Sequence, residues 1–180
     1  MWTILPAISF AALLLAFSAR LGDGDMLRCW RESFLSAAVI CGLVVVASSE
    51  LLSIFSMLTQ GWLVVVWSAV GVASVSGCVR QLLRTKPRFN AGGVNWRSRW
   101  TFAIAGVVVV VLAIGLAALA APLNDWDSMV YHMSRVAHWA QNRTIAFYPT
   151  PEVRQLIFGP GAELAILHGY VLSGTDRLGA

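Results

Sequence analysis

The chain has 180 residues, of which 58% are hydrophobic and only 12% are charged. A soluble domain averages about 45–50% apolar and about 25% charged residues. The composition therefore excludes a disordered segment and a disulfide scaffold, and it indicates that lipid surrounds much of the chain. The net charge of +4 fits either nucleic-acid binding or basic cytoplasmic loops, and the positions of the charges decide between them.

Four long apolar runs come first along the chain, at residues 2–19, about 33–49, 61–79 and 100–121. Each approaches the ~20 residues that cross a hydrocarbon core of ~30 Å. Backbone groups that lack water must pair within a helix, so residues 1–121 are predicted to form four transmembrane helices. The first run lacks the basic start and short apolar core of a signal peptide, which favours a retained helix over a cleaved signal.

The basic residues between these runs predict how the chain is oriented. Nine of the thirteen Lys and Arg residues lie in the loops after the first and third runs, and the loop after the second run has none. The positive-inside rule places both basic loops in the cytoplasm. The N-terminus and residues 122–155 are then external, in an integral membrane protein that we expect in a bacterial inner membrane. Because the basic cluster works as a topology signal, no nucleic-acid partner is expected.

Four residues in or beside the apolar runs carry little functional signal. A charge inside a membrane helix is a functional candidate, but Glu50, at the end of the second run, is more simply a carboxylate at the water boundary. Residues 51–58 after it are too short to span and either extend the helix or lie at the interface. Cys29, Cys41 and Cys78 form no CxxC pair and are interpreted as small hydrophobic residues.

A polar segment follows the fourth run, and its residues 127–142 have helical periodicity. At about 100° per residue they separate into an arc of charged and polar side chains and an arc of Met, Val and Ala. This pattern predicts an external amphipathic helix along the membrane surface, with its apolar face in lipid or against the bundle. Asn124 or Asp125 can cap the start of this helix.

The polar face of this helix presents Asp127, Tyr131 and Arg135 at successive i, i+4 positions. The carboxylate could act as a general base or metal ligand, and the arginine could clamp a phosphate through two hydrogen bonds. The alternative is a solvated face with an ordinary ion pair. Asp127, His132 and His138 do not share one tight face, so no metal site is assigned and a divalent cofactor has no clear place.

An apolar segment, residues 162–172, follows the sequence Phe158-Gly-Pro-Gly. Pro160 suits the first turn of a helix, and residues 156–180 are interpreted as the start of a further transmembrane helix. Glu163 would lie at its external end, near the amphipathic helix. The sequence leaves two roles open for this carboxylate: part of the site, or a cap of the helix start.

The external segment resembles that of a known enzyme family. Residues 126–150 read WDSMVYHMSRVAHWAQNRTIAFYPT, and residues 158–174 read FGPGAELAILHGYVLSG. The pattern is similar to the first external loop of the GT-C membrane glycosyltransferases, in the branch of protein O-mannosyltransferases and lipid A aminoarabinose transferases. Asp127 stands at the acidic position of that loop and Tyr131 and Arg135 on its juxtamembrane helix. Trp139 stands at its turn, and Gly159-Pro160 matches the entry to the next span.

The resemblance covers roughly residues 100–174, and it has departures. Ser128 stands where a second acidic residue is common, although Asp125 could substitute for it. The basic residue usual before the prolines is absent, and three spans precede the helix that is normally first. Members of the family are several times longer, so this chain is expected to be an N-terminal piece of such a protein.

The resemblance implies an all-α, polytopic transmembrane bundle with glycosyltransferase activity. Such an enzyme transfers a sugar from a polyprenyl-phosphate donor, held in the membrane lipid, to a glycan, lipid or protein acceptor at the outer face. Asp127, with Asp125 nearby, would act as the base, and Arg135 would stabilise the departing phosphate. The residues implied to contact the substrates are Tyr131, Arg135, His132, His138 and Glu163. The alternative is a non-enzymatic polytopic protein, either a transporter or an assembly subunit, which a charge buried mid-span would favour.

Overall fold

The computed structural model describes residues 2–20, 26–84, 99–120 and 126–174, and all structural statements below concern these residues. Helices make up 84% of the structure, and the described part of the chain contains no strand. The all-α class predicted from the sequence is therefore confirmed.

Four long helices correspond to the four apolar runs: α1 (Ile4–Arg20), α2 (Met26–Ile54), α3 (Gln60–Arg84) and α4 (Arg99–Ala120). Helix α2 continues past Glu50 to Ile54, so the first half of the short apolar stretch, residues 51–54, extends the helix. By length and composition, residues 29–54 and 60–84 could each cross a membrane, whereas α1 and α4 supply shorter apolar segments.

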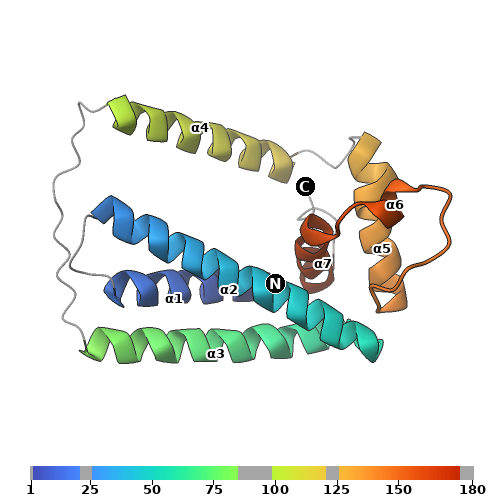
Figure 1. Ribbon diagram of the computed structural model, residues 1–180, viewed down its shortest axis with the longest axis horizontal. Coiled ribbons are helices and arrows are strands. Elements are labelled where there is room, and N and C mark those ends of the chain that lie inside the picture. The colour runs from blue at the N-terminus through green and yellow to red at the C-terminus, as the bar shows by residue number, and fades with distance from the viewer. Residues whose placement is uncertain (1, 21–25, 85–98, 121–125, 175–180) are drawn as a thin grey trace.

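Helices α1, α2 and α3 pack side by side in alternating directions, whereas α4 lies apart from them (Figure 1). The buried positions of the three packed helices are mostly small side chains. In their described parts these are Ser9, Ala12, Ser18, Ala19, Ser33, Ala37, Ser48, Ser49, Ser74 and Cys78, beside only two large residues, Leu63 and Trp67. Many of the large apolar side chains are exposed instead, and every described side chain of α4 is exposed.

A second group of helices covers one end of this bundle. It consists of a π-helical segment (Ser128–His132), α5 (Met133–Asn142), the single turn α6 (Arg154–Ile157) and α7 (Gly161–Ser173). Residues 126–174 are called the cap below. Figure 1 shows α5 and α7 beside each other, crossing the end of the bundle where α2 finishes and α3 begins.

An apolar core joins the cap to this end of the bundle. Leu58, Leu63 and Trp67 meet Val136, Trp139, Leu164, Leu167 and Leu172. Hydrogen bonds close the same junction: the Leu58 amide donates to the Arg143 carbonyl over 3.3 Å, and the Ser53 and Thr144 hydroxyls lie 2.8 Å apart. The cap is therefore seated on the turn between α2 and α3.

The predicted helix over residues 127–142 is present, but it is not uniform. Its first part is π-helical, and the wider i→i+5 turn rotates the later side chains relative to a regular helix. As a result Arg135 and Trp139, predicted on the polar face, are buried, while Met129, predicted on the apolar face, is 56% exposed. The apolar face packs against α7 and the bundle, one of the two surroundings expected for it.

Helix α7 has 13 residues and ends at Gly174, whose left-handed φ of 72° lets its amide donate to the Tyr170 carbonyl. At 1.5 Å per residue the helix is about 20 Å long, shorter than a ~30 Å hydrocarbon core. It also runs across α2 and α3, not along them (Figure 1). The start of a further transmembrane helix, predicted in residues 156–180, is still a prediction.

Candidate functional site

The loop that follows α5 determines which charged residues meet. Arg143 ends α5 in a left-handed conformation, with φ of 58°. The chain then runs without helix through residues 145–152, where Pro149 and Pro151 disfavour helix. The single turn α6 returns the chain to the start of the cap. Through this return, residues 152–155 contact residues that lie about twenty to thirty positions earlier, on the π-helical segment and α5.

Arg154 links two carboxylates at the surface of the cap. Its Nη1 donates to Asp127 Oδ1 over 2.7 Å, while its Nε and Nη2 donate to the two oxygens of Glu152 over 2.8 and 3.1 Å. The guanidinium also lies 5.5 Å from the centre of the Tyr131 ring. These hydrogen bonds lower the pKa of Glu152 and raise that of Arg154. The Asp127 side chain is 60% exposed, so it is open to a substrate.

A buried ion pair lies directly behind this surface group. The side chains of Arg135 and Glu163 are each 2% exposed, with Arg135 Nη1 3.1 Å from Glu163 Oε1. His132 Nδ1 lies 3.1 Å from the same oxygen. Glu163 belongs to the first turn of α7, yet it makes no capping bond there. Its carboxylate therefore pairs with side chains of the preceding helix, and a role of Glu163 in a functional site is still a prediction.

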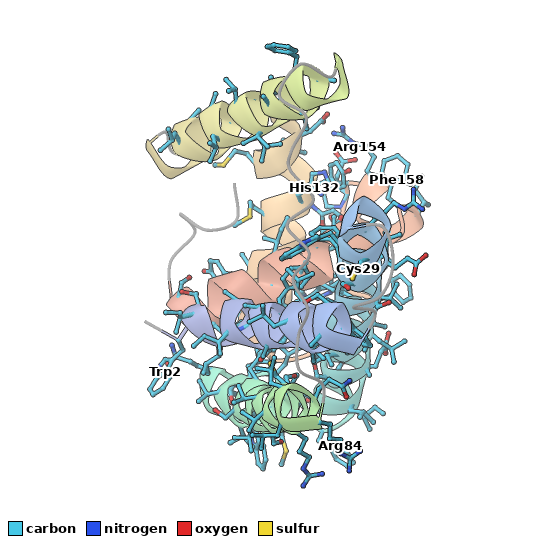
Figure 2. The ribbon with its side chains drawn as sticks, turned by 90° about the vertical axis from the view of Figure 1, so that its left-hand side faces the viewer. Trp2, Cys29, Arg84, His132, Arg154 and Phe158 are labelled. Atoms are coloured by element: carbon cyan, nitrogen blue, oxygen red, sulfur yellow. The ribbon has the colours of Figure 1, made fainter. Side chains whose placement is uncertain are left out.

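Arg135 holds the returning loop in place. Its Nη2 donates to the backbone carbonyls of Arg154, Gln155 and Phe158. The phosphate-clamping role predicted for Arg135 does not fit this geometry, because the guanidinium is buried and both terminal nitrogens already have acceptors. Figure 2 shows His132, Arg154 and Phe158 grouped together on the cap, far from Arg84 at the other end of α3. In the described structure the cation beside Asp127 is Arg154.

A third group contains Gln155, Tyr148 and His138. The Tyr148 hydroxyl donates to Gln155 Oε1 over 2.7 Å, and Gln155 Nε2 donates to the Val130 carbonyl and the Ser134 hydroxyl. His138 stacks on Tyr148, with ring centres 3.5 Å apart. Burial raises the pKa of the Tyr148 hydroxyl, against the opposing effect of the Arg135 charge.

The residues predicted from the sequence thus fall into neighbouring groups. Asp127 and Tyr131 lie with Arg154, and their neighbours Arg135 and Glu163 form the buried pair, which the partly exposed His132 joins. His138 is separate, against Tyr148, and Asp125 lies outside the described residues. Sequence reasoning missed Arg154 and Gln155, which no helical spacing relates to Asp127 or Ser134. Their only signal was that charged and polar residues are scarce elsewhere and gather in this segment.

No group of three or more His, Cys, Asp or Glu side chains in the described parts of the chain is arranged to hold a metal ion. No protein-family model matches this chain, and no curated protein or solved structure shows significant similarity to it.

Proposed function

We propose that this chain is part of an integral membrane glycosyltransferase that takes a sugar from a polyprenyl-phosphate donor, with α1–α4 in the membrane and the cap on its outer face. The observation that carries the proposal is the exposed Asp127 carboxylate, held by Arg154 beside the Tyr131 ring. It lies in the segment whose sequence resembles the catalytic loop of such enzymes. The proposal has a membrane part and a chemical part.

The membrane part is supported by how side-chain sizes are distributed in the bundle. Helices in lipid gain little by burying large apolar groups, so their contacts favour small residues that allow close approach. Here Ser, Ala and Cys are buried between α1, α2 and α3, while residues such as Leu43 and Val72 are 69% and 71% exposed. In water this outward apolar surface would be unfavourable, because about 25 cal/mol is lost for each Å² of apolar area exposed.

The orientation is supported by the positions of the basic residues and of the cap, which lie at opposite ends of the bundle. Arg84 ends α3 at the end where α1 also finishes, while the cap lies at the other end (Figure 1). If the basic loops are cytoplasmic, the cap and the turn between α2 and α3 are external. The cap contacts the turn between α2 and α3, and the charge pattern predicts that both are external.

In the proposed reaction, Asp127 accepts the proton of an acceptor hydroxyl while that oxygen attacks the anomeric carbon of the donor sugar. The bond between the anomeric carbon and the phosphate oxygen breaks, and polyprenyl phosphate leaves with the electron pair. Arg154 is the cation placed to interact with the negative charge on the phosphate. Arg135 and Glu163 act as positioning residues, because they hold the loop that carries Arg154.

The experiment is transfer from radiolabelled polyprenyl-phosphate sugars in membranes that contain the native protein. Asp127→Asn should abolish transfer while leaving membrane insertion and folding intact, since an exposed ion pair contributes only about 0–1 kcal/mol. Glu152→Gln is the matched control, because it removes the other carboxylate on the same arginine and should retain most activity. Transfer that persists in the Asp127→Asn variant, or that is lost equally in both variants, would overturn the assignment.

The alternative of a transporter or assembly subunit gains no support from the described residues. A transport site calls for charged groups buried midway along the spans. The ionised side chains that are buried in the described structure, Arg135 and Glu163, belong to the cap.

A further inference from the structure

An open groove of about 670 Å³ lies between α1 and α3. Its volume falls within the ~300–1,000 Å³ range of small-molecule sites. Its wall includes Leu5 and Ile8 on α1 and Val72, Val75, Val79 and Arg80 on α3. Every lining residue belongs to one of these two helices, so the groove is distinct from the candidate site in the cap.

The wall of the groove is apolar over nearly its whole length. Val72, Val75 and Val79 follow one another at i, i+3 and i+7, which places them in one stripe along α3, and they are 43–71% exposed. The Ser76 hydroxyl donates to the Val72 carbonyl over 2.6 Å, so its proton is already used within the helix. An empty groove would forfeit dispersion contacts along this stripe. Its occupant must therefore be a long apolar group.

The length of the groove matches one leaflet of a bilayer. Its lining residues on α3 run from Ser68 to Arg80, which are twelve positions apart. At 1.5 Å per residue this span is about 18 Å, and half of a ~30 Å hydrocarbon core is about 15 Å. An acyl chain that lies in the groove from near the bilayer midplane therefore brings its headgroup close to Arg80.

Charge at one end of the groove identifies the headgroup. Arg80 is the ionisable residue of the wall; its side chain is exposed, and no hydrogen bond or ion pair engages it within the described part of the chain. Neither α1 nor α3 contains an acidic residue, and Glu32, the acid of α2 nearest in sequence to its start, does not line the groove. Arg84 lies one turn beyond Arg80 and adds a second positive charge at the same end of α3.

We infer that this groove holds a diacyl phospholipid of the cytoplasmic leaflet with an anionic headgroup, one acyl chain along the valine stripe and the phosphate on Arg80. Basic pockets between membrane helices on the cytoplasmic side suit such headgroups. The inference rests on the membrane part of the proposed function and not on its chemical part. Arg80 lies near the end of α3 that is opposite to the cap, so this lipid is not the sugar donor (Figure 1).

The test is native mass spectrometry of the full chain in neutral detergent micelles, with added phosphatidylglycerol or phosphatidylcholine of identical acyl chains. Phosphatidylglycerol should bind about fivefold more tightly, because its net charge is negative. Arg80→Gln should weaken its binding by about tenfold, because a hydrogen bond to a charged group is lost. Arg80→Lys keeps the charge and should retain most of the binding.

A second variant tests the acyl chain without changing any charge. Val75→Trp fills the groove with a large ring and should weaken phosphatidylglycerol binding by about fivefold or more. Two matched controls lie outside the groove wall at exposed positions: Arg31→Gln on α2 and Val65→Trp on α3. Both should alter binding by less than about twofold.

Four results would overturn the inference. Equal binding of both lipids would show that the groove takes any surrounding lipid, and displacement by free glycerol phosphate would show a headgroup site alone. A lipid-free dimer that Val75→Trp dissociates would make the groove an interface between two copies. The fourth result is that the groove variants behave like their controls.

Failure of this inference and failure of the transferase proposal can be told apart. Phosphatidylglycerol binding with sugar transfer that ignores Asp127 overturns the transferase alone. Asp127-dependent transfer without selective binding of phosphatidylglycerol overturns the lipid site alone.

Discussion

The bundle of α1–α3 and the cap are both helical, but they are held together in opposite ways. Between α1, α2 and α3 most of the buried residues are small, as where Ser9 Oγ lies 3.4 Å from the position a Cβ would take on Gly71, although Phe10 and Phe34 also pack edge to face between α1 and α2. In the cap a buried arginine joins three segments through a carboxylate and three carbonyls. The bundle is therefore held together by small side chains that allow its helices to approach closely, and the cap is held together by long polar side chains.

This difference follows from the surroundings proposed for each region. In lipid, close backbone approach and dispersion hold helices together, because burying apolar groups gains little. At a membrane surface, a short loop with few apolar residues has little hydrophobic area to bury. It needs hydrogen bonds and ion pairs to fix its backbone. The two regions should therefore respond differently to the same kind of substitution.

The largest effect is expected from breaking the buried pair in the cap. Glu163→Ala leaves Arg135 charged and unpaired, which should destabilise the cap by about 3–5 kcal/mol. Hydrogen exchange should increase in residues 126–174 and stay unchanged in α1 and α3. The double variant Arg135→Met/Glu163→Leu should recover much of the loss, since it removes both charges. If Glu163→Ala increases hydrogen exchange equally in the cap and in α1 and α3, the cap is not stabilised independently of the bundle.

A smaller effect is expected from adding volume to the bundle. Gly71→Leu places a large side chain against Ser9 and should destabilise the α1–α3 contact by about 1–3 kcal/mol, measured by denaturation in detergent micelles. Gly77→Leu is the matched control on the same helix, because no atom lies within 4 Å of the added Cβ, and it should be tolerated. If both leucine variants unfold at the same denaturant concentration, close approach is not what holds these helices together.

The smallest effect concerns pH and is confined to the cap. Hydrogen bonds from Arg154 lower the pKa of Glu152 below its usual 4.5. The hydrogen bonds between Arg154 and the Glu152 carboxylate therefore stabilise the cap fully above the usual pKa of 4.5. This stabilisation is lost as the pH falls through the lowered pKa of Glu152. Proteolysis of the 145–158 loop should accelerate below about pH 4 in the native chain, and Glu152→Gln should remove this dependence. An unchanged acid response in the variant would assign it to another group.

Hydropathy alone located the four long helices, with ends that differ by up to seven residues, because apolar runs of that length in lipid leave the backbone no other way to satisfy its hydrogen bonds. Periodicity also located the helix that carries Asp127, but it misplaced Arg135 and Trp139. A uniform rotation per residue cannot anticipate a π-helical turn. That four spans form one membrane bundle is still a prediction.

Contacts between distant residues were harder to anticipate. The pairing of Asp127 with Arg154 depends on how two prolines and a left-handed Arg143 turn the chain back, which no local pattern encodes. Glu163 was identified as near the helix, yet its partner in the buried pair could not be chosen from several nearby cations. The groove between α1 and α3 was invisible in the sequence, since its wall combines residues of two helices that lie about sixty positions apart.

The buried pair also sets an order of events during synthesis. Arg135 and Glu163 are 28 residues apart in the chain. At about 5–20 residues per second, a ribosome adds that length in roughly one to six seconds. Throughout that interval the arginine is charged and without its carboxylate, which disfavours entry of α5 into lipid. In the proposed topology, the charge of Arg135 would hold the nascent cap at the water boundary until Glu163 is synthesised and pairs with it.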